Sequence, residues 1–504
     1  MRVKRAVLFL IVTSASLATS ASLAGVLSLE RLSVALAILG SLLAWYVVFT
    51  LKDGNLASFS FLFATFFALY TLSPTLEGLL AGVDSLASSK EVESVLWGRE
   101  IPLGFISVLS NVALLAFAIG LLKSHLTNAN LFGAPLNKTC LSPRLRTSSD
   151  MYAWLYYLGI GAFLLGMVLS LLDLTRVGGL QAIITPRGER LVALAENRGS
   201  LPSSPLVFSG LAVAILGWIY AGNKRFRGLL LMALVGLWLV YLLIQGDRRF
   251  ILYTLLVGLG VAHVYRGLSL KLSLRVLFVI TLVILLFSAF GNVRWMLPML
   301  LGGTLSLRDA GSWIAENFSW SWFAPSSNEF MGPYITLIVT ATDPNWWSLS
   351  GAPLWGISYF YALPNLLPRS LYPGEKWESL SFKFSDYVYV SYLPLDFPFP
   401  IGFGFSPLAE ACLNFGLSAW SPFVIFLLWG WFSGQLETWV RKGPLPYRGI
   451  VYALLLPQAF NLNRIDFVWA FQEAIYFVFM GLLLLASARV FYLSMRRMRI
   501  LPGG

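Results

Sequence analysis

The sequence is poor in charged residues. Of its 504 residues only 12% are charged, whereas 57% are hydrophobic. A soluble globular protein is about one-quarter charged, so this composition excludes an ordinary soluble enzyme. The mean hydropathy is +0.74, and the chain contains many apolar runs of the length, about 20 residues, that crosses a bilayer. The sequence therefore predicts a polytopic membrane protein.

Cysteine and histidine are almost absent as well. The predicted topology, given below, places Cys140 and Cys412 on opposite sides of the membrane, which argues against a disulfide and against a thiolate metal site. His125 and His263, the only histidines, both lie near cytoplasmic ends of expected spans. A metal site built from paired histidines is therefore not expected, and the sequence predicts no metal and no other cofactor.

The charge that is present is mostly basic, with a net charge of +12. Basic cytoplasmic loops that meet anionic membrane lipid account for such an excess. No basic stripe lies on a soluble domain, so a nucleic-acid partner is not expected. Membrane lipid is the partner that this charge pattern favours.

The apolar runs predict an all-α fold with about twelve transmembrane helices. These runs lie at 6–27, 32–51, 56–75, 104–122, 152–174, 205–222, 228–246, 249–265, 272–293, 416–438, 447–462 and 467–492.

Three regions follow from these spans. Residues 1–293 form an N-terminal transmembrane bundle with an outer loop at 175–204. Residues 294–415 form one large outer (periplasmic) loop, which is rich in aromatic residues and proline. Residues 416–504 form the C-terminal transmembrane helices. The aromatic residues of the large loop could stack on sugar rings, but for most of them we favour a membrane-interface belt or a small packed core.

The basic loops set the orientation. Residues 2–5 place the N-terminus in the cytoplasm, and alternation of the spans then places every loop with only basic charge on that side. The basic tail at 496–499 is also cytoplasmic. The sequence thus predicts a multi-pass protein of the cytoplasmic (inner) membrane with both termini inside. The first span has features of a cleaved signal peptide, but its removal would leave the remaining topology unchanged.

A set of arginines lies on the outer side, although membrane proteins normally keep their basic residues in cytoplasmic loops. Cations placed there, next to a membrane, suggest an anionic ligand such as a lipid pyrophosphate. Ion pairing with Glu189 and Glu196 is the alternative within the first outer loop, and anchoring in lipid headgroups is the alternative at the span ends. The arginines are Arg176, Arg187, Arg190, Arg198, Arg248, Arg249 and Arg294.

The turn Gly246-Asp247-Arg248-Arg249-Phe250 joins two expected spans on the outer side. Asp247 is well placed to cap the returning helix. Adjacent residues of a helix point about 100° apart, so we expect only one of the two arginines to face the interior of the bundle.

The segment 402–416, "GFGFSPLAEACLNFG", is the other unusual stretch. Ser406 and Pro407 have the character of a helix N-cap and first helical residue, and Gly404 permits close approach of the backbone to a ligand. Glu410 and Asn414 lie one turn apart on the same helix face. A carboxylate in so apolar a setting is costly unless it is functional or paired. Pairing with one of the arginines is the alternative.

These features together resemble the O-antigen polymerases (Wzy type) and related oligosaccharide repeat-unit polymerases. The resemblance rests on the arginine-bearing outer loop, the Gly-x-Arg-Arg turn, the "GFGFSPLAEACLNFG" segment and the stretch 364–373, which includes Arg369 and is followed by Lys376. It implies a membrane glycosyltransferase of the GT-C type that acts on polyprenyl-pyrophosphate-linked oligosaccharides at the outer face. The related O-antigen ligases use an outer-loop histidine, and the absence of an outer histidine here favours the polymerase.

The resemblance also implies roles for the residues. Arginines would neutralise the pyrophosphate leaving group, and a carboxylate would accept the proton of the attacking hydroxyl without any metal. Glu410 is the first candidate for that base and Asp247 the second. The expected pyrophosphate-binding residues are Arg176, Arg248, Arg249, Arg294, Arg187 and Arg190, and the expected substrate-binding residues are Asn414, Ser406, Gly404 and Arg369.

Other functions stay open at this point. The expected partners are the lipid-linked donor and acceptor, and a regulator of polysaccharide chain length could bind as well. A transporter or flippase of lipid-linked saccharide would show polar residues in mid-span and related halves, whereas the polar signals here gather at the outer ends of the spans. An O-antigen ligase, or a scaffold or sensor without turnover, is the remaining alternative.

Overall fold

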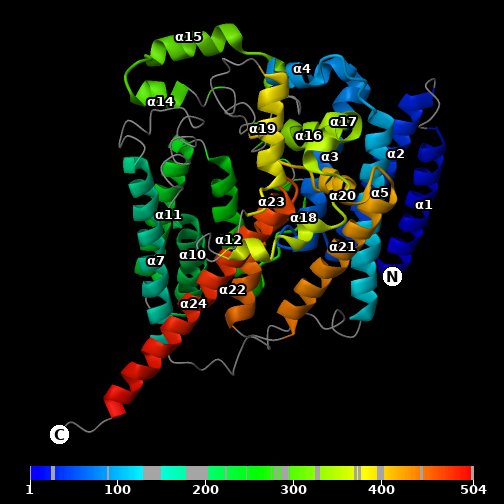
Figure 1. The fold of residues 1–504 in the computed structure, drawn as a ribbon. Helices are drawn as coiled ribbons and strands as arrows, with labels where there is room; N and C mark the ends of the chain where they lie inside the picture. Colours follow the sequence, from blue (N-terminus) through cyan, green and yellow to red (C-terminus); the bar gives the residue numbers. More distant parts are fainter. Residues whose placement is uncertain are drawn as a thin grey trace.

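The fold is known from a computed structural model and consists of helices (Figure 1). The structure describes residues 2–23, 29–87, 90–128, 149–176, 202–221, 224–245, 247–273, scattered positions between 275 and 293, 296–323, 330–367, 372, 376–393, 402–442 and 446–500.

Seven helices within the described residues are long and apolar enough to cross a membrane. They are α2 (Glu30–Lys52), α3 (Phe59–Ala81), α5 (Leu103–Thr127), α7 (Ser149–Arg176), α10 (Ser203–Tyr220), α11 (Lys224–Gln245) and α24 (Phe467–Ile500). These helices confirm the predicted all-α polytopic membrane class.

The five other expected spans differ in how well they match helices of the structure. Three coincide with helices that are not among those seven, namely α1 (Arg2–Leu23), α12 (Arg248–Arg266) and α21 (Trp420–Arg441). The run 447–462 is interrupted, because Pro457 lacks the N–H that a continuous helix would use. It forms α22 (Pro446–Leu455) and α23 (Gln458–Asn461) instead. The run 272–293 lies mostly outside the described residues. The count of twelve and the GT-C fold therefore stay predictions.

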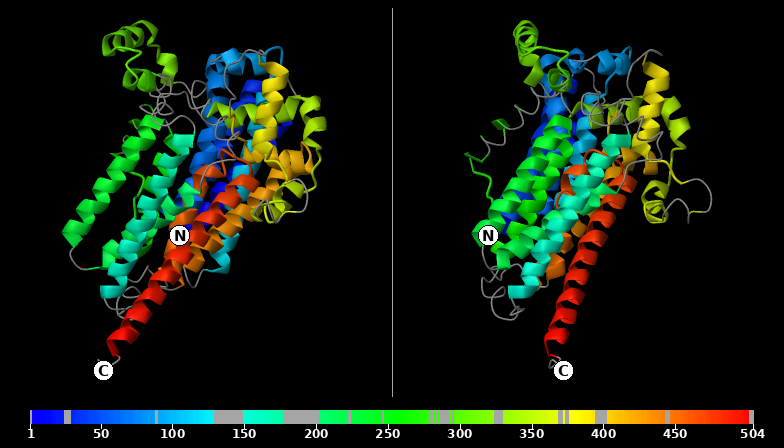
Figure 2. Two further views of the ribbon diagram at one scale, coloured as in Figure 1. Left: turned by 60° about the vertical axis from the view of Figure 1, so that its left-hand side comes forward. Right: turned by 90° about the vertical axis from the view of Figure 1, so that its left-hand side faces the viewer.

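The long helices form two groups that stand side by side (Figures 1 and 2). One group contains α1, α2, α3, α5 and α21, and the other contains α7, α10, α11, α12, α22 and α24. Glycines allow the closest pairs. A Cβ atom on Gly430 of α21 would lie 2.1 Å from the carbonyl oxygen of Phe117 in α5, and one on Gly210 of α10 would lie 2.6 Å from the amide nitrogen of Phe163 in α7. Backbones that touch in this way are typical of packing inside membranes.

The large outer loop contributes short helices, and most of them lie at one end of the bundle (Figure 1). They are α14 (Met296–Leu301), α15 (Leu307–Asn317), η3 (Trp320–Phe323), α16 (Met331–Thr342), α17 (Pro344–Ser350), α18 (Ile357–Phe360), η5 (Pro364–Leu366), α19 (Leu380–Tyr392) and α20 (Pro407–Phe415). The short segments η2 (Val83–Leu86) and α4 (Lys90–Leu96) lie at the same end (Figure 1). We call this the outer end, following the predicted topology, whereas α1 begins and α24 ends toward the opposite end (Figure 1).

Asp343 ties the early outer loop to the late one. Its carboxylate accepts a hydrogen bond from Arg99 at 2.7 Å, from the Tyr387 hydroxyl at 2.8 Å and from the Tyr392 hydroxyl. The other carboxylate oxygen accepts the N–H of Asn345 at 2.9 Å and so caps α17. One buried carboxylate thereby connects the loop after α4, the start of α17 and the end of α19.

We expect Asp343→Asn to destabilise the protein in a pH-dependent manner. Burial raises the pKa of Asp343, but hydrogen bonds from Tyr392, Arg99 and Tyr387 outweigh burial and lower the pKa to about 2 from the ordinary 3.8. A carboxylate whose pKa is lower in the folded state stabilises fully above its unfolded pKa, and the benefit is lost as the pH falls toward the folded value. The substitution should cost about 2 kcal/mol at pH 7.

Thermal unfolding in detergent between pH 7 and pH 2 measures this difference. Asp386→Asn, at an exposed position of α19, is the control and should unfold like the wild type throughout. The Asp343→Asn difference should shrink from about pH 4 downward. A difference that stays constant over the whole range contradicts the assignment.

Candidate functional site around the start of α24

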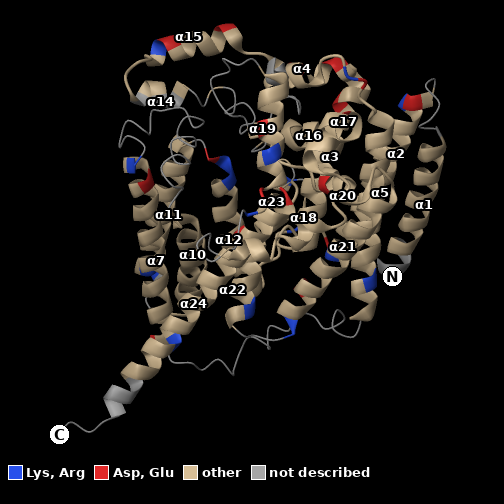
Figure 3. Ribbon diagram, viewed as in Figure 1, with Lys and Arg blue, Asp and Glu red and all other residues tan. Residues whose placement is uncertain are grey.

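The first part of the site is the outer end of α12. The Asp247 carboxylate accepts the N–H of Phe250 at 3.4 Å, which confirms the expected cap. The cap places Arg248 and Arg249 in the first turn of the helix. Figure 3 shows this basic turn and the end of α7, with Arg176, at the same end of the bundle. The N-terminus of a 19-residue helix adds a partial positive charge to that of the arginines.

Arg249 is the arginine that turns toward α24. Its guanidinium lies 3.8 Å from the Glu473 carboxylate, and the two side chains are 17% and 8% exposed. Three aromatic rings surround the same guanidinium at centroid distances of 4.6 Å for Phe250, 5.7 Å for Tyr253 and 5.9 Å for Trp469. The cation is thus held in an aromatic setting, where its charge is screened less than in water.

Glu473 is a site residue that the sequence analysis missed. Its carboxylate accepts hydrogen bonds from the Tyr253 hydroxyl at 2.8 Å and from the Asn461 amide at 2.7 Å. The distance of 3.8 Å to Arg249 is too long for a hydrogen bond, so that pairing is electrostatic. The available signal was a carboxylate in the apolar run 467–492, which is costly in a membrane unless it is paired or functional.

The turn between α23 and α24 contains a second missed residue, Arg464. Its carbonyl oxygen accepts the N–H of Phe405 at 2.6 Å, and its guanidinium lies 6.0 Å from the ring centroid of Phe460. Gly404 has a φ of 77°, and a Cβ there would lie 2.4 Å from the Arg464 carbonyl oxygen. Gly404 thus permits a close approach of its backbone to this turn, and its contact with substrate stays a prediction.

The third part is α20, which starts as the sequence predicts. The Ser406 side chain accepts the N–H of Leu408 at 3.3 Å and caps the helix, while its own N–H donates to the Thr336 hydroxyl at 2.9 Å. Ser406 thus has a local structural role, and contact with substrate stays a prediction.

Glu410 and Asn414 share one hydrogen-bond network, as their spacing predicts. Both contact Ser358 of α18, whose hydroxyl donates to Glu410 at 2.7 Å and accepts from the Asn414 amide at 2.7 Å. The second oxygen of Glu410 accepts the N–H of Phe467, the first residue of α24, at 2.8 Å. Glu410 is only 1% exposed, so an acceptor hydroxyl can reach it only if a segment that covers it, such as α18, moves.

A second buried carboxylate lies next to Glu410. Asp466, the residue immediately before α24, accepts hydrogen bonds from the hydroxyls of Ser379 at 2.5 Å and Ser381 at 2.8 Å. Burial raises the pKa of Glu410, and the charge of Asp466 raises it further. In its ionised form, a carboxyl group with a raised pKa accepts a proton more readily than an ordinary carboxylate does.

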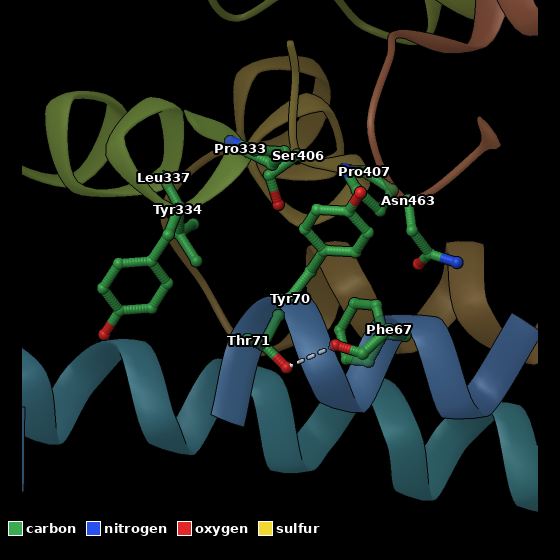
Figure 4. Close-up of a pocket in the computed structure, with 9 residues that line it drawn as sticks. All are labelled: Phe67, Tyr70, Thr71, Pro333, Tyr334, Leu337, Ser406, Pro407 and Asn463. Carbon is green, nitrogen blue, oxygen red and sulfur yellow. Dashed lines mark hydrogen bonds between the residues drawn. The ribbon is translucent and has the colours of Figure 1, made fainter. Parts of the chain in front are cut away.

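A narrow hollow lies beside the start of α20 (Figure 4). The ring of Tyr70 points toward Ser406 and Pro407, and the Thr71 hydroxyl donates to the Phe67 carbonyl oxygen at 2.8 Å (Figure 4). The lining residues are Phe67, Tyr70, Thr71, Pro333, Tyr334, Leu337, Ser406, Pro407 and Asn463. The hollow is too narrow for a water molecule, so we interpret it as a packing feature.

Of the remaining predicted residues, the structure describes Arg176. Arg176, at the end of α7, lies 3.7 Å from Asp173 of its own helix and is 45% exposed. Four other arginines lie outside the described residues, so the structure says nothing about their predicted contacts. They are Arg187, Arg190, Arg294 and Arg369.

The start of α24 and the turn before it join the parts of the site. The turn contacts Gly404 and Phe405, Phe467 donates to Glu410, and Glu473 pairs with Arg249. Among the described residues, no group of three or more His, Cys, Asp or Glu side chains is placed to hold a metal ion. No family model, curated protein or solved structure matches the chain, so a functional assignment depends on the site's own chemistry.

Proposed function

We propose that the protein is a membrane glycosyltransferase that polymerises polyprenyl-pyrophosphate-linked oligosaccharides at the outer face of the cytoplasmic membrane. The observation that carries this proposal is the position of Arg249, an arginine surrounded by aromatic rings at the outer end of the bundle. Helix α24 contacts both groups of the site. Its Trp469 ring packs against Arg249, and its Phe467 N–H donates to the buried carboxylate of Glu410. An anion-binding cation and a base connected by one helix are the two groups that the reaction needs.

Arg249 and Arg248 would bind the pyrophosphate of the donor, with Arg176 and Arg294 as further candidates. Charge neutralisation makes pyrophosphate a better leaving group, and a cation in an apolar setting does this more effectively than one in water. The helix N-terminus of α12 adds to the positive potential. The isoprenoid chain would lie in the membrane next to the apolar helices, with the glycan outside.

In the chemical step, an acceptor hydroxyl oxygen bonds to the anomeric carbon of the donor sugar. The bond from that carbon to the pyrophosphate oxygen breaks, and polyprenyl pyrophosphate leaves with the electron pair. The hydroxyl proton passes to the Glu410 carboxylate after the α18 segment has moved. Asp247 is the second candidate for the base, although its carboxylate caps α12.

The test is polymer formation by the purified protein in lipid nanodiscs. The substrate is polyprenyl-pyrophosphate-linked oligosaccharide extracted from the cells that make the protein, and the product is a ladder on a glycan-stained gel. A polymerase adds repeat units to a lipid-linked chain. Movement of substrate across a vesicle membrane without elongation would identify a flippase instead, and transfer only to a lipid A acceptor would identify a ligase. Absence of all three activities contradicts the proposal.

A further inference from the structure

Two groups of aromatic residues in the large outer loop differ in burial. Trp346 represents the first group, because it is 0% exposed and packs against Phe384, Tyr387 and Phe405 at centroid distances of 5.1 to 6.4 Å. These residues form a small core among α17, α19 and the start of α20. Packing alone explains them.

The second group lies on α15 and η3, and we call it the aromatic shelf. Trp313 and Trp322 stack at 6.1 Å with an interplanar angle of 26°, and Phe318 makes edge contacts with Trp320 and Trp322 at 5.7 Å. Phe323 contacts Phe318 and Trp320. Trp320 is nevertheless 80% exposed and Phe318 47% exposed. The rings hold one another in place while open faces remain for a ligand.

The shelf lies beyond the outer ends of the long helices. Figures 1 and 2 show α14 and α15 past the ends of α7 and α11, on the outer side of the bundle. The glycan of a lipid-linked substrate extends outward from the headgroup level, into this region.

The charge of the shelf favours a glycan over an anionic lipid surface as its ligand. Residues 302–323 contain one basic residue, Arg308, and two acidic ones, Asp309 and Glu316, so their net charge is −1. Helices that bind an anionic membrane surface have an excess of lysine and arginine on the polar face. A neutral sugar chain needs no such excess. Its C–H faces stack on aromatic rings, and its hydroxyls bond to exposed polar groups such as Asp309 and Asn317.

We propose that the aromatic shelf is a binding site for the neutral oligosaccharide part of the substrate. The identity of that oligosaccharide as a lipid-linked repeat unit rests on the proposed function. The shelf would hold the sugar chain away from the membrane, while the pyrophosphate lies at α12.

The binding test uses protein labelled with 5-fluorotryptophan in nanodiscs, followed by fluorine NMR. Soluble maltohexaose, cellohexaose and chitohexaose are added separately, and the Trp320 resonance is assigned from Trp320→Phe. At least one of these sugars should shift it in a saturable manner. Trp97 is the matched control, because it is 79% exposed at the outer end but directly follows α4 and so lies outside the shelf. Its resonance should not move.

Substitutions extend the test. Trp320→Ala should weaken sugar binding about three- to tenfold, the effect of losing one stacking contact, and Trp97→Ala should leave it unchanged. The proposal is overturned if none of the three sugars shifts the Trp320 resonance. It is also overturned if that resonance responds only when anionic phosphatidylglycerol replaces phosphatidylcholine in the nanodisc, because the shelf is then a membrane anchor.

The two proposals can fail separately. Sugar binding at the shelf without a polymer ladder would leave the shelf intact and contradict the polymerase. A polymer ladder from a protein whose shelf binds no sugar would support the polymerase and contradict the proposed binding site at the shelf. Where a ladder forms, Trp320→Ala should raise KM for the lipid-linked substrate and leave kcat near the wild-type value, because the shelf contacts the sugar chain far from the reacting atoms.

Discussion

Replacing Arg249 with alanine should reduce polymer formation at least about 100-fold, the loss typical of removing a group that stabilises developing negative charge. Arg249 lies at the outer end of α12 among three aromatic rings, where a cation binds an anion more strongly than it does in open water. Arg249→Lys should retain part of the activity, because the charge remains while the planar fork that fits a phosphate is lost. The ladder assay measures both variants.

A structural effect has to be separated from this loss. Arg249→Ala also removes the cation near the buried Glu473 carboxylate. Because the pair is partly exposed, we expect this loss to destabilise the protein by up to about 3 kcal/mol. The double variant Arg249→Ala/Glu473→Gln removes both charges and should restore most of the lost stability. If Arg249 binds pyrophosphate, the double variant should fold and still fail to polymerise.

Arg266→Ala is the matched control for the same helix. Arg266 lies in the last turn of α12 and stacks on Trp218 at 4.8 Å, so its removal also deletes a cation–π contact. It lies at the end opposite to the site, and its variant should retain polymer formation. Full activity of the Arg249→Ala/Glu473→Gln protein would show that Arg249 serves only to pair with Glu473.

Much of this arrangement follows from local sequence signals. The caps by Asp247 and Ser406 depend on residues two or three positions apart, and the common surroundings of Glu410 and Asn414 depend on a spacing of one helical turn. Hydrophobic runs likewise predict the long helices, because each span satisfies its own backbone hydrogen bonds. Such features need no knowledge of distant parts of the chain.

The missed residues depend on contacts between distant segments. Glu473 meets Arg249 across more than 200 positions of the chain, and no pattern near either residue specifies the pairing. The role of Gly404 is similar, because the Arg464 carbonyl that it approaches belongs to another helix connection. The sequence could suggest that these residues were unusual, but only the packing of α12, α20 and α24 shows what they contact.

Glu410→Gln should reduce polymer formation about 100- to 10,000-fold, the usual contribution of a general base, while the protein still folds. The glutamine carbonyl can accept the N–H of Phe467, and its amide group can donate to the Ser358 hydroxyl, which can rotate its own proton away. We therefore expect a loss of only about 1 kcal/mol in the free energy of unfolding.

Ser358→Ala is the comparison that separates the base from a structural group. It removes one hydrogen-bond donor to Glu410 but leaves the carboxylate in place. Its effect on the free energy of unfolding should be similar to that of Glu410→Gln. If Glu410 only organises the contact between α18, α20 and α24, the two variants should lose activity to the same small degree. If Glu410 takes the proton, Glu410→Gln should lose far more activity than Ser358→Ala at equal stability. Wild-type activity of a folded Glu410→Gln protein would contradict the base assignment, and Asp247→Asn would then test the remaining carboxylate at the start of α12.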